Sequence, residues 1–213
     1  MRQGFPIATP GLRVGLLGGS FDPAHEGHIH ISEYALSRFG LDRVWWLVSP
    51  GNPLKPHGPA PLDQRISFAD ELVQDPRIVV TGLETTLGTR MTVDTLRRLT
   101  ALYPGVRFVW LMGSDNLAQF SQWDEWRAIA DLVPIGVIAR PGSRLSAKFS
   151  VAARVLARYR LPESRASALA STPPPAWVMI DVPLNYLSSS AIRAARRAKT
   201  ARRRRKNAGA TPE

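Results

Sequence analysis

Short apolar runs alternate along this chain with segments whose apolar residues recur every three or four positions. Runs of the first kind are typical of buried β-strands, and the spacing of the second kind is typical of amphipathic helices. Strands are predicted over residues 13–17, 44–48, 78–81, 106–112, 135–139 and 177–181. Helices are predicted over residues 26–38, 62–73, 92–102, 124–130, 147–159 and 189–199. This alternation indicates βαβ units, so the expected fold is α/β: a Rossmann-like, doubly wound, mainly parallel sheet with helices on both faces.

The segments between these elements are expected to be loops. We expect a loop over 113–123, and a linker or surface loop over 161–175, which ends in three consecutive prolines. No internal repeat or shift of composition divides the 213 residues, so we expect one domain over 1–199 and a basic, disordered tail over 200–213. In a sheet of this type ligands bind beyond the carboxyl ends of the strands, so the loops that follow strands are the places to look for a site.

The composition excludes several classes of protein. Hydrophobic residues make up 44% of the chain and charged residues 21%, which is incompatible with a disordered protein. Cysteine is absent, which excludes disulfides, thiolate metal sites and a cysteine nucleophile. No apolar run approaches the roughly 18 residues of a membrane span, and the start of the chain lacks the pattern of a secretory signal. We therefore expect a cytoplasmic protein without a membrane partner.

The net charge of +11 is concentrated at one end of the chain. From Arg193 onward there are nine basic residues and one acid, so this end carries +8 and the first 192 residues carry +3. A basic tail adds weak, non-specific attraction for anions. We therefore expect no specific nucleic-acid partner. A non-catalytic nucleic-acid-binding protein that uses the tail is the alternative from another class.

The loop after the first predicted strand carries the residues GGSFDPAHEGH at 18–28. Gly18 and Gly19 are expected to let the backbone turn tightly and approach a ligand. His25 and His28 lie three residues apart, so they share one face at the start of a helix, where free N–H groups and the helix dipole attract phosphate. A glycine-rich turn with two surface histidines is the alternative, and a metal pair lacks a third ligand. The paired glycines directly after a strand favour the phosphate site.

Segment 18–28 resembles the GG(T/S)FDPxHxGH signature of the nucleotidylyltransferase superfamily. Further motifs occur in the order seen in bacterial nicotinate-nucleotide adenylyltransferases, and they lie at 50–55, 92–96, 113–115 with Phe120 and Trp123, 140–142 and 187–193. The similarity extends from about residue 13 to residue 193. It implies transfer of AMP from ATP to nicotinate mononucleotide, giving nicotinate adenine dinucleotide and pyrophosphate in NAD biosynthesis.

The resemblance also implies roles for individual residues. His25 and His28 are the expected catalytic donors to the phosphates. The residues expected to bind ATP are Gly18, Gly19, Ser20, Phe21, His25, His28, Gly113, Asp115, Ser189 and Arg193. Those expected to bind nicotinate mononucleotide are Lys55, Thr92, Asp115 and Trp123. Mg²⁺ is the expected cofactor, bound mainly through the ATP phosphates, and no protein metal site is expected.

Selectivity for the acid is expected to come from backbone N–H groups near Thr92 and Trp123, while the Trp123 ring stacks on the nicotinate. Simpler interpretations stay open for four residues. Ser189 and Arg193 belong to a helix start where the serines would act as N-caps without a ligand, and Lys55 would be a solvated loop lysine. Asp115 would be the N-cap of the next helix, which is compatible with binding ribose. The other large indoles are expected in the core, and they are Trp45, Trp46, Trp110 and Trp126.

The chain departs from the family pattern in two places. Arg90-Met91-Thr92 stands where the family usually has Ser-Tyr-Thr, and an arginine run replaces a final apolar helix and a His-containing end. Neither change removes a group that the reaction needs. Nicotinamide mononucleotide or phosphopantetheine is the alternative acceptor, although the chain length and the segment with Trp123 disfavour phosphopantetheine. The sequence leaves a homo-oligomer open.

Overall fold

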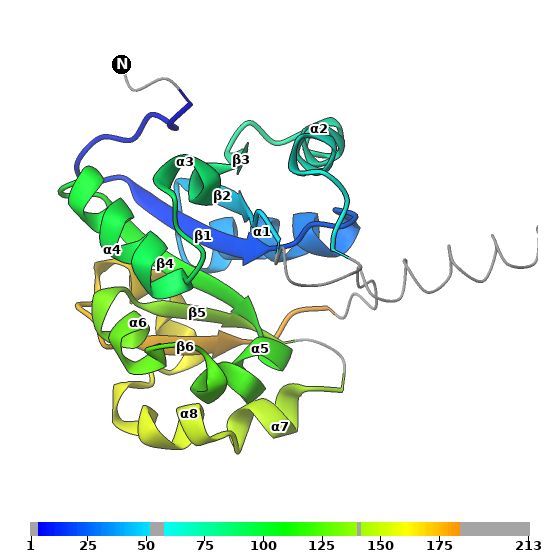
Figure 1. The fold of residues 1–213 in the computed structure, drawn as a ribbon. Coiled ribbons are helices and arrows are strands. Elements are labelled where there is room, and N and C mark those ends of the chain that lie inside the picture. Colours follow the sequence, from blue (N-terminus) through cyan, green and yellow to red (C-terminus); the bar gives the residue numbers. More distant parts are fainter. Residues whose placement is uncertain (1–3, 52–57, 140–141, 184–213) are drawn as a thin grey trace, which may run out of the picture.

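The computed structural model describes residues 4–51, 58–139 and 142–183. Within these ranges it contains one six-stranded sheet in the order β3-β2-β1-β4-β5-β6, and every neighbouring pair of strands is parallel (Figure 1). The strands are β1 (Arg13–Gly19), β2 (Arg43–Val48), β3 (Ile78–Thr81), β4 (Arg107–Gly113), β5 (Ile135–Ile138) and β6 (Trp177–Ile180). The expected α/β fold with a doubly wound, parallel sheet is therefore confirmed.

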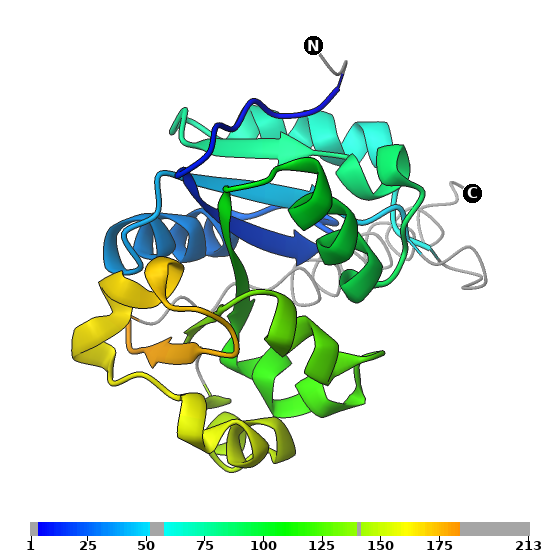
Figure 2. The same cartoon turned by 90° about the vertical axis from the view of Figure 1, so that its left-hand side faces the viewer.

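Helices cover both faces of the sheet (Figures 1 and 2). The α-helices are α1 (Glu26–Arg38), α2 (Leu62–Leu72), α3 (Leu83–Leu87), α4 (Thr92–Leu102), α5 (Ser114–Gln119), α6 (Trp126–Leu132), α7 (Arg144–Lys148) and α8 (Val151–Val155). Among the described residues, three segments form 3₁₀ helix, and they are η1 (Phe120–Gln122), η2 (Ala157–Tyr159) and η3 (Glu163–Ser171). Helices α1 and α2 with η3 pack on one face, and α3 to α8 pack on the other.

The strands form two hydrophobic cores because successive side chains point to opposite faces of the sheet. Trp45 and Trp46 are both fully buried, yet Trp45 joins the core under α4 and Trp46 joins the core under α1. Trp110 and Trp126 are 3% and 7% exposed and belong to the core under α4. The prediction that these four indoles lie in the core is confirmed.

The order of the strands creates a switch point between β1 and β4. The chain moves outward from β1 to β2 and β3, then places β4 on the other side of β1 and continues to β5 and β6. The pairing of β1 with β2 extends to Gly19 and Val48, whereas its pairing with β4 ends at Leu17 and Leu111. Ligands of doubly wound sheets bind in the crevice where neighbouring connections leave in opposite directions. The loops after β1 and β4 border that crevice.

Four segments differ from the sequence-based expectation. The first is the loop expected between residues 81 and 92, which contains the short helix α3 with Leu83 and Leu87 buried. The helix expected over 147–159 is interrupted, because Ser150 begins α8 by accepting a hydrogen bond at Oγ from the Ala153 N–H, at 3.2 Å. The segment 161–175 is not simply a loop: η3 buries Ala166, Leu169 and Ala170 against the core under α1, a spacing that places them on one side of a helix. The loop expected over 113–123 contains α5 and η1, with Leu117 and Phe120 buried.

Candidate active site

The two glycines at the end of β1 do not form the tight turn that we expected of them. Gly18 and Gly19 are the last residues of the strand, and a Cβ on Gly18 would lie 2.6 Å from Cη2 of Trp110. Gly18 is therefore required by the packing of an indole from the neighbouring strand. The turn is made at Phe21, whose φ of 44° lies in the left-handed region that a residue with a Cβ seldom adopts.

The Phe21 ring is buried, which offsets the strain of its backbone. It stacks on Trp46 with the ring centroids 4.9 Å apart and lies 4.6 Å from the centroid of His28. Trp46 in turn donates from Nε1 to Ser32 Oγ at 2.8 Å, and Ser32 donates to the His28 carbonyl at 2.8 Å. The contact with Phe21 therefore fixes the ring of His28, and the hydrogen bonds through Trp46 and Ser32 fix its backbone.

His25 and His28 together cap the N-terminus of α1. His25 is the N-cap residue, and its Nδ1 accepts a hydrogen bond from the Gly27 N–H at 3.1 Å. The Nδ1 of His28 accepts from the N–H of His25 at 3.2 Å, which completes a reciprocal capping box. The two imidazole centroids are 4.0 Å apart. The histidine pair is therefore held as one unit by the start of the helix.

This cap determines the tautomer of both rings. A nitrogen that accepts a hydrogen bond carries no proton, so each neutral imidazole carries its proton on Nε2 and can donate it there. The cap also uses N–H groups that we expected to be free for phosphate: that of Gly27 donates to His25 Nδ1, and that of His28 donates to the His25 carbonyl at 2.8 Å. Donation to an anion at this helix end therefore depends on the imidazoles more than the sequence suggested.

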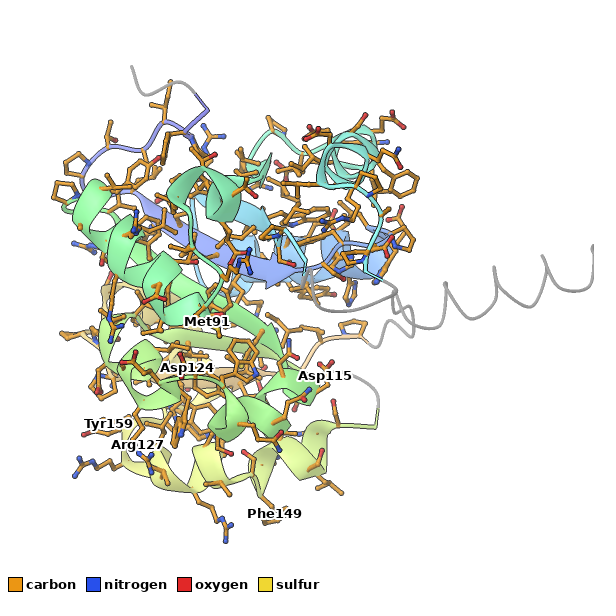
Figure 3. All side chains as sticks on the ribbon, viewed as in Figure 1. Met91, Asp115, Asp124, Arg127, Phe149 and Tyr159 are labelled. Carbon is orange, nitrogen blue, oxygen red and sulfur yellow. The ribbon has the colours of Figure 1, made fainter. Side chains whose placement is uncertain are left out.

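The loop after β4 lies on the other side of the switch point. Gly113 ends the strand and is the N-cap of α5, so the half-buried Asp115 is the second residue of that helix and not its cap (Figure 3). Ser114 is fully buried, and its Oγ lies 2.6 Å from Ser143 Oγ at the start of α7. The hydroxyl pair joins the loops after β4 and β5, which fixes where α5 begins and so where Asp115 lies.

The residues expected to meet the nicotinate lie on α4 and before α6. Thr92 is the first residue of α4, and its N-cap residue Met91 is 50% exposed and offers no side-chain cap (Figure 3). Trp123 is half-buried against the ring edges of Trp110 and Phe120. Its backbone N–H donates to the Phe120 carbonyl at 3.0 Å. Because this amide already has an acceptor, it could meet a carboxylate only by sharing its hydrogen. This weakens the role that we expected for it.

An ion pair joins these two segments. Arg97 of α4 donates to both carboxylate oxygens of Glu125, at 3.1 and 2.5 Å. Glu125 is the N-cap residue of α6 and follows Trp123 by two residues. The pair therefore brings the segment of Trp123 to α4, on the same face of the sheet as Thr92.

Sequence reasoning missed two buried ionisable residues near these loops. Arg65 of α2 is 3% exposed, and Glu84 of α3 is 6% exposed. Burial raises the pKa of the Glu84 carboxyl to about 7, although a hydrogen bond from Thr95 acts to lower that pKa. The spacing gave a signal for Arg65, since it lies on the same helical stripe as Leu62 and Ala69. We found no comparable signal for Glu84.

Several expectations fall on residues outside the described ranges. Lys55, Ser189 and Arg193 belong to this group, as do the predicted helix over 189–199 and the tail over 200–213. Elsewhere in the molecule, a cavity of about 310 Å³ lies at the amino edge of the sheet, where Arg107 and Pro134 stand at the beginnings of β4 and β5. It is on the opposite edge from the histidine pair. Within the described part of the chain, no helix is long and apolar enough to cross a membrane.

The fold is shared with a solved structure. The structure titled Plasmodium falciparum nicotinic acid mononucleotide adenylyltransferase complexed with NaAD matches with a TM-score of 0.65, covering 86% of this chain and 83% of that chain. The two sequences are 19% identical, so this likeness establishes the fold and nothing further.

A family model described as cytidylyltransferase-like matches residues 16–195, and with the fold and the histidine pair at the switch point it defines a nucleotidyltransferase of that class. Curated relatives narrow the class. A protein of Roseobacter denitrificans named "Probable nicotinate-nucleotide adenylyltransferase" is 60% identical over 193 residues, which are 91% of this chain and 97% of that protein. A protein of the same name from Ruegeria pomeroyi is 56% identical over 92% of this chain and 92% of its own length. Another from Methylorubrum extorquens is 52% identical over 85% of this chain and 99% of its own length. The chain belongs to the nicotinate-nucleotide adenylyltransferase family.

Proposed function

We propose that this protein transfers the AMP unit of ATP to nicotinate mononucleotide, releasing pyrophosphate and forming nicotinate adenine dinucleotide. The observation that carries the proposal is the capping box of His25 and His28 beside the switch point, since it orients two imidazole donors where a doubly wound sheet binds its ligand. The family membership supports the same reaction.

The reaction needs positioning and charge stabilisation more than proton transfer. The phosphate of the mononucleotide is already an anion, so it attacks the α-phosphorus of ATP without a general base. A new P–O bond forms as the bond to the bridging oxygen breaks, and the electron pair leaves with pyrophosphate. His25 and His28 donate from Nε2 to phosphate oxygens as negative charge moves onto the leaving group. Their rings keep this aim because the cap holds Nδ1.

We include Mg²⁺ in the proposal, bound mainly through the ATP phosphates. The described residues contain no group of three or more His, Asp or Glu side chains that could hold a metal ion, so phosphate oxygens and water would supply most of its ligands. When bound, the ion neutralises charge on the triphosphate. On the protein side, the residues proposed to contact ATP are those of the loops after β1 and β4, with Asp115 accepting hydrogen bonds from the ribose hydroxyls, together with Ser189 and Arg193.

The acceptor site is proposed at the start of α4, with Lys55 as a further contact. The first N–H groups of a helix have no partner within it, and Met91 supplies no side-chain cap, so the N–H groups at Thr92 suit a carboxylate. Trp123 supplies an aromatic face for the nicotinate ring. An amide in place of the acid would bring its own N–H donors against the helix N-terminus. We place the reaction in the cytoplasm, where ATP is available.

Pyrophosphate release with ATP and Mg²⁺ tests this proposal when nicotinate mononucleotide, nicotinamide mononucleotide and phosphopantetheine are supplied in parallel. We expect kcat/KM to be at least about tenfold higher for the acid than for the amide, because an unpaired buried donor costs about 1–3 kcal/mol. Faster turnover with either of the other acceptors would contradict the proposed substrate. The release of pyrophosphate without any acceptor would contradict adenylyl transfer itself.

A further inference from the structure

Arg65 joins the loops that follow β1 and β2 from a buried position on α2. Its Nη1 donates to the carbonyl of Ser20 at 2.5 Å and to the carbonyl of Ser49 at 2.8 Å. Its Nε donates to the carbonyl of Ala60 at 2.7 Å, just before α2 begins. Three separate stretches of backbone therefore meet on one guanidinium that is almost completely removed from solvent.

One of these stretches is the loop that carries the histidine pair. Ser20 precedes Phe21, whose strained backbone and stacked ring lead into His25. Ser49 also donates from its N–H to the Gly19 carbonyl at 2.9 Å. The loop after β1 is therefore held to the loop after β2 at two successive residues, and Arg65 provides the second connection.

The remaining nitrogen of Arg65 indicates that stability alone does not explain this residue. Nη2 is buried and makes no hydrogen bond within the described residues. Burial lowers the pKa of the guanidinium, whereas the negative charge of Asp22 raises it. Arginine nevertheless stays charged, because its ordinary pKa lies far above neutrality. A buried charge with an unpaired donor destabilises a fold relative to an apolar side chain of similar size.

We propose that Arg65 is a positioning residue for adenylyl transfer, which holds the loop after β1 against the loop after β2 so that His25 and His28 stay aimed at the reacting phosphate. This inference rests on the proposed function. Arg65 touches backbone carbonyls and acts only through the loop. Displacement of catalytic groups by about 1 Å can lower a rate about a hundredfold, so a connection of this kind affects catalysis without contact with substrate.

The substitutions Arg65→Lys and Arg65→Met test the inference. Lysine keeps the charge, but a single ammonium cannot reproduce the planar fork that reaches three carbonyls from two nitrogens. Methionine keeps the apolar stem and removes the charge. The matched controls are Arg77→Lys and Arg77→Met, because Arg77 follows the same helix but is exposed and forms an ion pair with Asp75. The quantities to measure are kcat, the KM for ATP and Tm, with rates expressed per folded molecule from circular dichroism.

If Arg65 positions the histidines, kcat falls at least about tenfold in Arg65→Met while the KM for ATP changes less than about threefold, because the loss is in the transition state. Arg65→Lys should recover part of kcat, and both Arg77 variants should match the wild type. Folded variants with wild-type kcat would overturn the inference. So would a fall in Tm with unchanged kcat per folded molecule, or a failure of both Arg65 variants to fold, since each indicates a structural role alone. An inactive wild type would instead contradict the proposed function.

Discussion

The imidazole of His28 is held on two sides by contacts that leave its Nε2 in a defined direction. Nδ1 accepts the N–H of His25, and Phe21 packs against the ring with the centroids 4.6 Å apart. Oriented donors of this kind stabilise charge that develops in the transition state, and they need no reorganisation when it forms. His25 is held in the same way through Gly27. The site therefore depends on two single side chains whose rotamers are set by backbone groups.

The substitution His28→Ala should lower kcat at least about a hundredfold while the fold survives, because the loss of one transition-state donor typically has that effect. Steady-state kinetics and a thermal melt measure the two quantities. His30→Ala is the matched control: it lies on the same helix, and its ring nitrogen is 2.7 Å from the Pro183 carbonyl. A His28→Ala enzyme with normal melting and near wild-type kcat would contradict the role of the pair.

Trp123→Ala should lower kcat/KM for nicotinate and nicotinamide mononucleotides by similar factors. The two rings present nearly the same face to an indole, and loss of stacking weakens binding by about 1–3 kcal/mol for each. Discrimination between acid and amide resides in the substituent, so the ratio of the two kcat/KM values should stay close to that of the wild type. Phe149→Ala, on an aromatic residue that is 73% exposed, is the control. A collapsed ratio in Trp123→Ala would place the selectivity in the ring contact.

At the scale of elements, the junction of α3 and α4 is held by a buried hydroxyl–carboxyl network. Thr95 Oγ1 lies 2.8 Å from Thr89 Oγ1, 3.4 Å from Glu84 Oε1 and 3.2 Å from the Met91 carbonyl. Thr89 also donates from its N–H to the Glu84 carbonyl at 2.9 Å. These bonds join both sides of the short connection that ends at Thr92, so they determine where the N-terminus of α4 lies.

Glu84 should make the stability of the protein depend on pH. Its folded pKa of about 7 lies above the ordinary value of 4.5, so the folded state binds the proton more tightly than the unfolded chain does. The stabilisation is fully present below about pH 4.5 and is lost as the pH rises through about 7. A shift of this size corresponds to about 3 kcal/mol.

Glu84→Gln is neutral at every pH and should not lose this stability. Denaturant unfolding at pH 5 and at pH 8 measures the difference. Between pH 5 and pH 8, the free energy of unfolding of the wild type should fall by about 2–3 kcal/mol relative to that of Glu84→Gln. Glu71→Gln, an exposed position on α2, serves as the control. The same difference between wild type and Glu84→Gln at both pH values would show that Glu84 does not carry a raised pKa.

The elements differ in how well the sequence predicted them. α1, β3 and α4 begin and end where periodicity and flanking turn residues place them, because each has a continuous apolar stripe. The interruption at Ser150 depends on a side-chain cap that competes with helix continuation, and periodicity does not register it. The 3₁₀ helix η3 was missed because the prolines that follow it dominate the composition of 161–175.

The candidate site was predictable to the extent that it lies within one short motif. His25 and His28 could be located from the sequence because they follow a strand at the start of a helix. The capping box, in which the Nδ1 atom of each ring accepts a backbone N–H, could not be predicted, because it depends on the rotamers of the two side chains. The helical spacing placed Arg65 on the buried face of α2, but its contact with the Ser20 carbonyl, 45 residues away, could not be read from the sequence. The contact of Glu84 is with Thr95 of the next helix, and it was missed because α3 was not predicted. Packing between elements, which a linear pattern does not contain, places both residues.

At the scale of the whole molecule, the two ends of the sheet differ in what they carry. The histidine pair and the loops after β1 and β4 lie at the carboxyl edge, as the switch-point rule requires, while the 310 Å³ cavity lies at the amino edge. Most of the net positive charge resides in the sequence from Arg193 onward, which lies outside the described residues. Residues 200–213 carry five of these basic residues and none of the residues proposed to bind substrate, so catalysis and this part of the chain are expected to be separable.

Deletion of residues 200–213 should leave kcat and both KM values near those of the full chain. The same deletion should remove the binding of a polyanion such as heparin at low salt, because that attraction comes from counterion release by clustered basic residues. Kinetics and a salt-dependent binding assay on the two proteins measure this. Loss of activity on deletion would show that the tail is part of the enzyme.

Adenylyl transfer to nicotinate mononucleotide is tested by product analysis. The full-length protein is incubated with ATP, Mg²⁺ and nicotinate mononucleotide, and both products are quantified by mass spectrometry and a pyrophosphate assay. We predict one nicotinate adenine dinucleotide for each pyrophosphate released, and loss of both products together in His28→Ala. Pyrophosphate without the dinucleotide, or no reaction by the folded wild-type protein, would contradict it.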